Sequence, residues 1–253
     1  MTPRWRAAGI PHAEAGVDRF SEQDSHWVRG TRPVTVPAGS AIVHGDLTVP
    51  EDARGIVLFA HGSGSSRFSE RNRWVARELQ RERLATLLMD LLTEGEADRD
   101  QVTAEHRFDI ELLARRVVST IDWVTRDLAT RPLPIGLYGA STGAAAALMA
   151  AVRRPNVVRA VVSRGGRPDL AESALSLVDA PTLLIVGARD TEVLTLNRFA
   201  YEHLRCERAL EIVPGASHLF EEQGTLEVVA RLTREWFIKH LHRSAIANAT
   251  QGW

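Results

Sequence analysis

Short apolar runs alternate with segments of helical spacing along most of this chain. Six runs rich in branched residues predict strands buried on both faces: Gly55–Ala60, Leu84–Met89, Pro134–Tyr138, Val157–Val162, Pro181–Val186 and Ala209–Val213. Six segments with apolar residues every three or four positions predict amphipathic helices: Ser69–Arg83, His106–Ala129, Ser141–Arg153, Asp169–Val178, Glu192–Cys206 and Thr225–Leu241. The alternation predicts an α/β fold, in which helices cover both faces of a mainly parallel sheet and ligands bind at the carboxyl ends of its strands.

Two further segments precede these runs and extend the expected sheet. Val34–Pro37 and Ser40–Val49 alternate roughly between apolar and polar residues, and Ala38–Gly39 between them suits a tight turn. They predict an antiparallel pair at one edge of the sheet. The expected sheet therefore has about eight strands.

The length of 253 residues suits a single domain of this class. We expect that domain to span residues 31–243. Residues 1–30 are polar and broken by proline and glycine, so we interpret them as an N-terminal extension, and residues 244–253 as a C-terminal tail.

Charge and cysteine content narrow the classes of partner. The formal net charge is −1, which provides no field to attract nucleic acid or an anionic membrane surface. Cys206 is the only cysteine, which excludes an internal disulfide and a zinc site built on paired cysteines. No run approaches the roughly 18 apolar residues of a membrane helix, and the first residues lack an apolar leader. We expect a cytoplasmic protein with small-molecule partners, no cofactor and no metal; the oligomeric state stays open.

A candidate nucleophile lies between a predicted strand and a predicted helix. Gly139-Ala140-Ser141-Thr142-Gly143 matches the G-x-S-x-G pattern directly after the strand PIGLY and before an alanine-rich helix. Small residues at 139 and 143 allow a serine to occupy a sharp, strained turn, and the helix start favours developing negative charge. The alternative is an ordinary glycine-flanked turn. The strand-to-helix context favours Ser141 as a nucleophile.

A serine hydroxyl needs a base, and the base needs a carboxylate to orient it. His218 follows the last predicted strand in the loop PGASH, and Asp190 follows the preceding strand in VGARD. Glu192 and Asp169 are the fallback candidates for the carboxylate, and a helix cap is the alternative role for Asp190. The order serine, aspartate, histidine is that of α/β-hydrolases.

Acyl transfer also needs donors for a tetrahedral oxyanion. The expected donors are the backbone N–H groups of Thr142, which follows the serine, and of Ser63, in the loop HGSGSS after the strand GIVLFA. That loop resembles a phosphate cradle, but no Gly-Lys-Ser/Thr follows it and the G-x-G-x-x-G pattern is incomplete. We interpret His61 as structural, bonded to local backbone.

These segments together resemble the dienelactone hydrolase-like branch of the α/β-hydrolase superfamily, whose domains occur alone or fused to a phosphoribosyltransferase-type domain. The name-giving enzymes use a cysteine nucleophile, whereas position 141 is serine, so the resemblance implies ester or lactone hydrolysis in general rather than hydrolysis of that lactone. Only about twenty residues separate the strand VVRAVV from the strand PTLLIV, where many esterases insert a helical lid. This short connection predicts an open, modest pocket without a large lid domain. The segments that carry the resemblance are FAHGSGSSRFSERN, LLMDLLTEGE, YGASTGAAAAL, VVSRGGRPDLA, PTLLIVGARD and PGASHLFEE.

Three arginines are expected near the active edge. Arg67, Arg164 and Arg189 lie in loops where a guanidinium group can bind a substrate carboxylate. Ion pairs with residues such as Glu70 and Asp169 are the alternative. We favour that alternative, because most such pairs are structural.

The sequence therefore predicts a serine hydrolase that cleaves a small carboxylic ester or lactone through an acyl-enzyme on Ser141. Transfer of the acyl group to an alcohol or amine, or cleavage of a peptide, would use the same residues. A ligand-binding or sensor protein that keeps the fold but turns over slowly is the non-enzymatic alternative.

Overall fold

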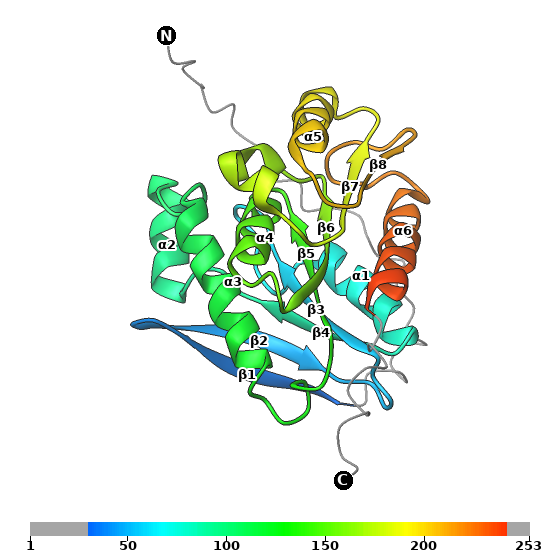
Figure 1. Cartoon of the computed structure of the whole chain (residues 1–253). Coiled ribbons are helices and arrows are strands. Elements are labelled where there is room, and N and C mark those ends of the chain that lie inside the picture. The colour runs from blue at the N-terminus through cyan, green and yellow to red at the C-terminus, as the bar shows by residue number, and fades with distance from the viewer. Residues whose placement is uncertain (1–29, 242–253) are drawn as a thin grey trace.

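The computed structural model describes residues 30–241. They form an eight-stranded sheet in the order β1-β2-β4-β3-β5-β6-β7-β8 (Figure 1). β2 is antiparallel to both β1 and β4, and the remaining pairs are parallel. The strands are β1 (Thr31–Ala38), β2 (Ala41–Thr48), β3 (Gly55–Ala60), β4 (Leu84–Met89), β5 (Ile135–Ala140), β6 (Val158–Arg164), β7 (Thr182–Gly187) and β8 (Arg208–Val213).

This sheet confirms the predicted mainly parallel architecture of about eight strands, including the antiparallel edge pair. The predicted extension, residues 1–30, lies outside the described residues except for Gly30, and the predicted tail, residues 244–253, lies outside them entirely. None of the helices within residues 30–241 is long and apolar enough to cross a membrane.

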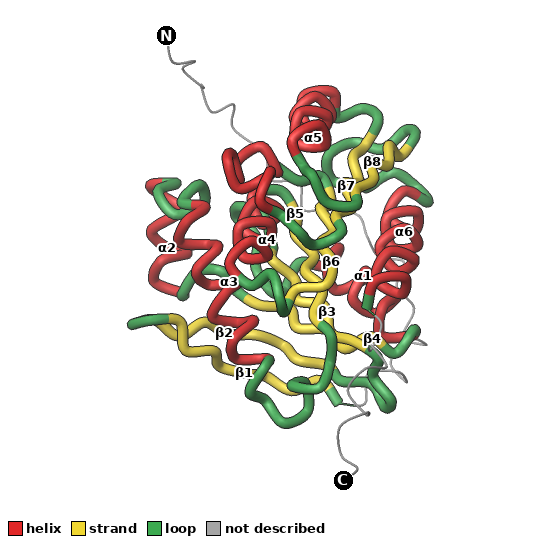
Figure 2. The backbone as a smooth tube through the Cα atoms, in the orientation of Figure 1, coloured by secondary structure: helices red, strands yellow, loops and turns green. Residues whose placement is uncertain are grey.

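Helices lie on both sides of the sheet (Figure 2). Figure 1 places α3 and α4 on one side and α1 and α6 on the other. Side chains of each central strand alternate between two buried clusters: Ile56 and Leu58 of β3 belong to the cluster with α3 and α4, and Val57 and Phe59 to the cluster with α1 and α6. The helices are α1 (Glu70–Arg81), α2 (Glu94–Thr103), α3 (Ile110–Val124), α4 (Thr142–Arg153), α5 (Thr191–His203) and α6 (Thr225–His240).

Two of the predicted helices differ in the structure. The helix expected over His106–Ala129 is α3, which begins only after Asp109 accepts a hydrogen bond from the N–H of Leu112 at 2.9 Å. The helix expected over Asp169–Val178 is instead a 3₁₀ segment, η2 (Pro168–Leu177), interrupted at Glu172, where φ is 48°. A residue with a Cβ at positive φ cannot continue a right-handed helix.

Helix α2 has no counterpart in the sequence prediction. Its sequence, EGEADRDQVT, contains no apolar stripe, and among its residues only Asp100 is buried. The helix is specified by its start, where the Thr93 side chain accepts from the N–H of Glu96 and the Glu96 carboxylate accepts from the N–H of Thr93. This capping box is the signal that could have revealed it.

The sheet topology determines where a site can form. β3, β4 and β5 are parallel neighbours, with Phe59 opposite Tyr138 and Ala60 opposite Gly139. The loop after β3 and the corner after β5 therefore meet at the carboxyl edge of the sheet. The segment between β6 and β7 holds only η2, so no large lid covers that edge.

Candidate active site

Ser141 occupies the corner between β5 and α4. Its φ of 50° and ψ of −125° lie in a region that a residue with a Cβ rarely adopts, at a cost of about 1–3 kcal/mol. Glycine is required on both sides: a Cβ on Gly139 would lie 2.4 Å from the Cα of Ala144, and one on Gly143 would lie 2.3 Å from the carbonyl oxygen of Ala60. These close backbone contacts hold the serine in its strained conformation.

His218 and Asp190 are directly bonded. Nδ1 of His218 lies 2.6 Å from Oδ2 of Asp190, and the carboxylate is the more buried partner, with 14% of its side chain exposed against 41% for His218. Asp190 precedes α5 but makes no side-chain capping bond. Its carboxylate therefore bonds His218 and does not cap α5.

The two fallback carboxylates lie elsewhere. Asp169 is bonded to Arg167, whose Nε and Nη2 donate to its oxygens at 2.8–3.2 Å. Glu192 is exposed in the first turn of α5. Neither is bonded to His218.

The segment after β6 connects the serine to the histidine. The N–H of Arg167 donates to the carbonyl oxygen of Ser141 at 3.0 Å. Two residues earlier, a Cβ on Gly165 would lie 3.1 Å from the carbonyl oxygen and 3.7 Å from Cε1 of His218. Ser141 and His218 thus lie against the same short segment at one edge of the sheet. Their side chains share no hydrogen bond within residues 30–241; such bonds are often long without substrate.

A carboxylate that sequence reasoning missed holds the histidine loop. Both oxygens of Glu222 accept from the N–H of Ser217, at 3.0 and 3.1 Å, and Arg189 contacts the same carboxylate at 3.4 Å. The hydrogen bond from Ser217 is the main reason that the pKa of Glu222 lies below its ordinary value. Because Ser217 adjoins His218 and Arg189 adjoins Asp190, Glu222 ties together the two loops of the pair. No motif in the sequence marks it.

The loop after β3 faces the start of α4. Oγ of Ser63 lies 3.1 Å from Oγ1 of Thr142, and a Cβ on Gly62 would lie 2.7 Å from the Cβ of Ser141. The first N–H groups of a helix have no intrahelical partner, so those at the start of α4 are available to an anion. The structure thus places Ser63 and Thr142, the residues predicted to donate to an oxyanion, beside Ser141.

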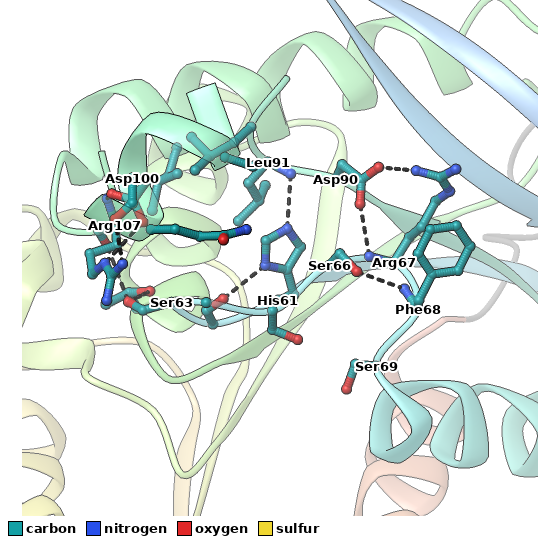
Figure 3. Close-up of a pocket in the computed structure, with 18 of the residues that line it drawn as sticks. His61, Ser63, Ser66, Arg67, Phe68, Ser69, Asp90, Leu91, Asp100 and Arg107 are labelled. Carbon is teal, nitrogen blue, oxygen red and sulfur yellow. Dashed lines mark hydrogen bonds and ion pairs between the residues drawn. The ribbon is translucent and has the colours of Figure 1, made fainter. Parts of the chain in front are cut away.

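His61 is structural, as expected. Nδ1 donates to the carbonyl oxygen of Gly62 at 2.8 Å, and Nε2 accepts from the N–H of Leu91 at 3.0 Å. Burial lowers the pKa of this imidazole, so the neutral form is favoured. With both nitrogens used, His61 fastens the loop after β3 to the loop after β4 (Figure 3).

The three arginines have different partners. Arg67 bonds the carboxylate of Asp90 and lies 3.7 Å from that of Asp46, and Arg189 contacts Glu222. Arg164 is 6% exposed and donates to the phenol oxygen of Tyr138 at 3.3 Å and to Oδ1 of Asn72 at 3.2 Å. The favoured ion pairs thus form for two arginines, with partners other than Glu70 and Asp169, and the third is held by neutral groups.

A cavity of about 1020 Å³ opens beside the loop after β3. Its lining includes Gly62, Ser63 and Thr142, and among the described residues it does not include Ser141 or His218. Helix α2, which the sequence did not predict, forms one of its walls. Nowhere in the described chain do three or more His, Cys, Asp or Glu side chains gather as metal ligands would.

Solved structures and curated proteins both include relatives of this chain that are identical to it at more than half of the aligned positions. The crystal structure of a dienelactone hydrolase from Anabaena variabilis is 55% identical, with a TM-score of 0.82, over 84% of this chain and 98% of that one. Two Mycobacterium tuberculosis proteins with the provisional name phosphoribosyl transferase are 57% identical over 209 residues, 82% of this chain and 46% of theirs. This chain thus spans about half the length of those relatives. No family model matches it.

More distant structures share the fold. Est1E from Butyrivibrio proteoclasticus is 13% identical with a TM-score of 0.69, and a dienelactone hydrolase-like phosphotriesterase from metagenomic libraries is 16% identical with a TM-score of 0.68. The predicted α/β-hydrolase fold is confirmed, and so is the resemblance on which it was based. On its identity to the Anabaena protein over nearly the whole of that chain, this chain belongs to the dienelactone hydrolase family of α/β-hydrolases.

Proposed function

We propose that this protein hydrolyses a small carboxylic ester or lactone through an acyl-enzyme on Ser141. The observation that carries the proposal is the strained φ of 50° at Ser141, at the same sheet edge as a histidine bonded to a carboxylate at 2.6 Å. Strain of this kind persists where the surrounding structure enforces it, and it is concentrated at functional sites.

In the proposed acylation, Nε2 of His218 takes the proton of Ser141 as Oγ attacks the carbonyl carbon. Asp190 accepts a hydrogen bond from Nδ1–H of His218, which leaves the Nε2 lone pair free for the serine, and its negative charge stabilises the imidazolium that forms. The N–H groups of Thr142 and Ser63 donate to the oxyanion. His218 then gives its proton to the oxygen of the leaving alcohol.

In the proposed deacylation, His218 takes a proton from water, whose oxygen attacks the acyl carbon. The tetrahedral intermediate collapses, the carboxylic acid leaves and the proton returns to Oγ of Ser141. An alcohol or amine in place of water gives acyl transfer by the same steps. Product analysis with and without added alcohol therefore distinguishes hydrolysis from transfer.

A fluorophosphonate probe tests the nucleophile. We expect the folded protein to be labelled at Ser141, as located by peptide mass spectrometry, and to hydrolyse 4-nitrophenyl acetate. Ser141→Ala should lose both properties. Absence of label on Ser141 in a folded sample would refute the proposal, and so would ester hydrolysis that Ser141→Ala retains in full.

A further inference from the structure

The large cavity continues from the proposed oxyanion site. Its wall includes Ser63 and Thr142, whose N–H groups are the proposed donors. A carbonyl oxygen held there therefore places one side of an ester at the mouth of this cavity. Most of the remaining wall comes from the loop after β3, the loop after β4 and helix α2, and His44 of β2, Arg107 and Leu113 of α3 complete it.

The arginines of the wall are already neutralised. Arg67 bonds Asp90, and Nε of Arg107 donates to Oδ2 of Asp100 at 2.9 Å. Figure 3 shows these two pairs on opposite sides of His61. Burial favours the neutral form of His61. Both guanidinium groups have carboxylate partners, so neither arginine of this wall is available to bind a substrate carboxylate or phosphate.

Helix α2 contributes polar groups that remain available. Within residues 30–241, Glu94 and Gln101 line the cavity and make no side-chain hydrogen bond or ion pair. A carboxylate accepts hydrogen bonds only, whereas an amide both donates and accepts them. Glu94 therefore repels anions and accepts from hydroxyl groups, and Gln101 can bond a hydroxyl group in either sense.

The same helix is held in place by polar contacts rather than by an apolar face. Nη2 of Arg116 donates to Oε1 of Glu96 at 2.8 Å, and Oδ1 of Asp100 accepts from the N–H groups of His106 and Arg107, each at 2.8 Å. Four serines of the loop after β3, at positions 63, 65, 66 and 69, also line the cavity. The wall thus offers many neutral hydrogen-bonding groups.

We propose that this cavity binds a neutral, hydroxyl-bearing part of the substrate, with Gln101 and Glu94 as the residues that determine specificity. The inference rests on the proposed esterase function, because it names the substrate class of that site. It predicts discrimination against substrates that carry a carboxylate at the same position.

Matched substrates test this inference. One arm compares 4-nitrophenyl 3-hydroxybutyrate and mono-4-nitrophenyl succinate with 4-nitrophenyl butyrate, and the other compares 2,3-dihydroxypropyl acetate with propyl acetate. Each kcat/KM is divided by the rate of hydroxide-catalysed hydrolysis, so that intrinsic reactivity cancels. In at least one arm we expect the hydroxylated ester to be preferred by about five-fold, the effect of one or two exposed hydrogen bonds. The succinate should be the poorest acyl substrate.

Two variants on α2 have matched controls on the same helix. Gln101→Leu should bring the hydroxyl preference down to about two-fold or less, and Glu94→Gln should raise the relative rate with the succinate by about three-fold. Val102→Leu and Asp98→Asn make comparable changes at exposed positions outside the cavity lining, so these ratios should stay unchanged.

Calorimetry on Ser141→Ala separates this inference from the proposed function. Tighter binding of 2,3-dihydroxypropyl acetate than of propyl acetate, abolished by Gln101→Leu, would support the cavity assignment even if the native protein shows no turnover. Equal binding of the two esters would overturn it, as would a hydroxyl preference that survives both α2 variants or a preference for the succinate. Loss of the proposed function would appear instead as absent hydrolysis of 4-nitrophenyl acetate.

Discussion

Nδ1 of His218 lies 2.6 Å from Oδ2 of Asp190 although 28 residues separate them in the chain. The two residues follow β8 and β7, which are parallel neighbours in the sheet. The loops are packed so closely that a Cβ on Gly187 would lie 2.4 Å from the carbonyl oxygen of Ala216. Because β7 and β8 pair in parallel, the loops that follow them bring the imidazole of His218 and the carboxylate of Asp190 into contact.

Asp190→Asn should reduce kcat for 4-nitrophenyl acetate by about 10²–10⁴-fold, because an amide favours the wrong tautomer of His218. Steady-state kinetics checks this. Asp169→Asn and Glu192→Gln are the controls, since neither carboxylate contacts the histidine, and we expect them to retain activity. A loss in either control that matches the loss in Asp190→Asn would contradict the assignment.

Ser141→Gly and Ser141→Ala should differ in stability although both lose activity. Glycine adopts a φ of 50° without strain, so we expect Ser141→Gly to raise the free energy of unfolding by about 1 kcal/mol. Alanine keeps the Cβ and the strain, so Ser141→Ala should stay close to the native value. Urea unfolding curves compare the three proteins. Equal stability of the two variants would show that the corner is not strained.

Gly143→Ala should destabilise the fold severely, by more than about 4 kcal/mol, because its Cβ would meet two backbone carbonyl oxygens at 2.3 and 2.4 Å. Gly95→Ala is the matched control. Its Cβ would meet nothing within 4 Å, and alanine favours a helix over glycine by about 1 kcal/mol. Thermal unfolding should show a large fall in Tm for the first variant and none for the second. A mild effect at position 143 would mean that α4 can move away from β3.

Asp100→Asn should lower the free energy of unfolding by about 1–3 kcal/mol at pH 7. Burial alone would raise the pKa of Asp100, but hydrogen bonds from the N–H groups of Arg107 and His106 outweigh burial and hold the pKa below its usual value. A depressed carboxyl pKa stabilises the fold above the unfolded value of about 4 and loses that effect as pH falls through the folded value.

The difference between the native protein and Asp100→Asn should therefore shrink below about pH 4. Urea unfolding at pH 7 and pH 3 measures it. Asp98→Asn, on the exposed face of the same helix, should change stability by less than about 0.5 kcal/mol at either pH. A penalty for Asp100→Asn that is the same at both pH values would show that the ionised carboxylate is not what anchors α2.

Much of the site was predictable because it lies where regular elements end. Ser141 was recognised from glycines at fixed positions between a strand and a helix, and His218 and Asp190 from their places after successive strands. Helix α2 was missed because helix prediction relied on an apolar stripe, and this helix packs polar residues against the domain. Glu222 was missed because a carboxylate in a loop has many possible partners.

The amino-acid sequence alone determined the order of the eight strands and of the helices other than α2 and η2, the strained corner at Ser141 and the chain order of the three candidate catalytic residues. These features depend on local periodicity and on contacts between near neighbours in the chain, which a linear pattern records. Tertiary structure alone decided which carboxylates neutralise Arg67 and Arg107, which neutral groups hold Arg164, and that α2 forms a wall of the cavity. Such outcomes depend on distances between side chains from separate loops, and those distances exist only once the sheet has brought the loops together.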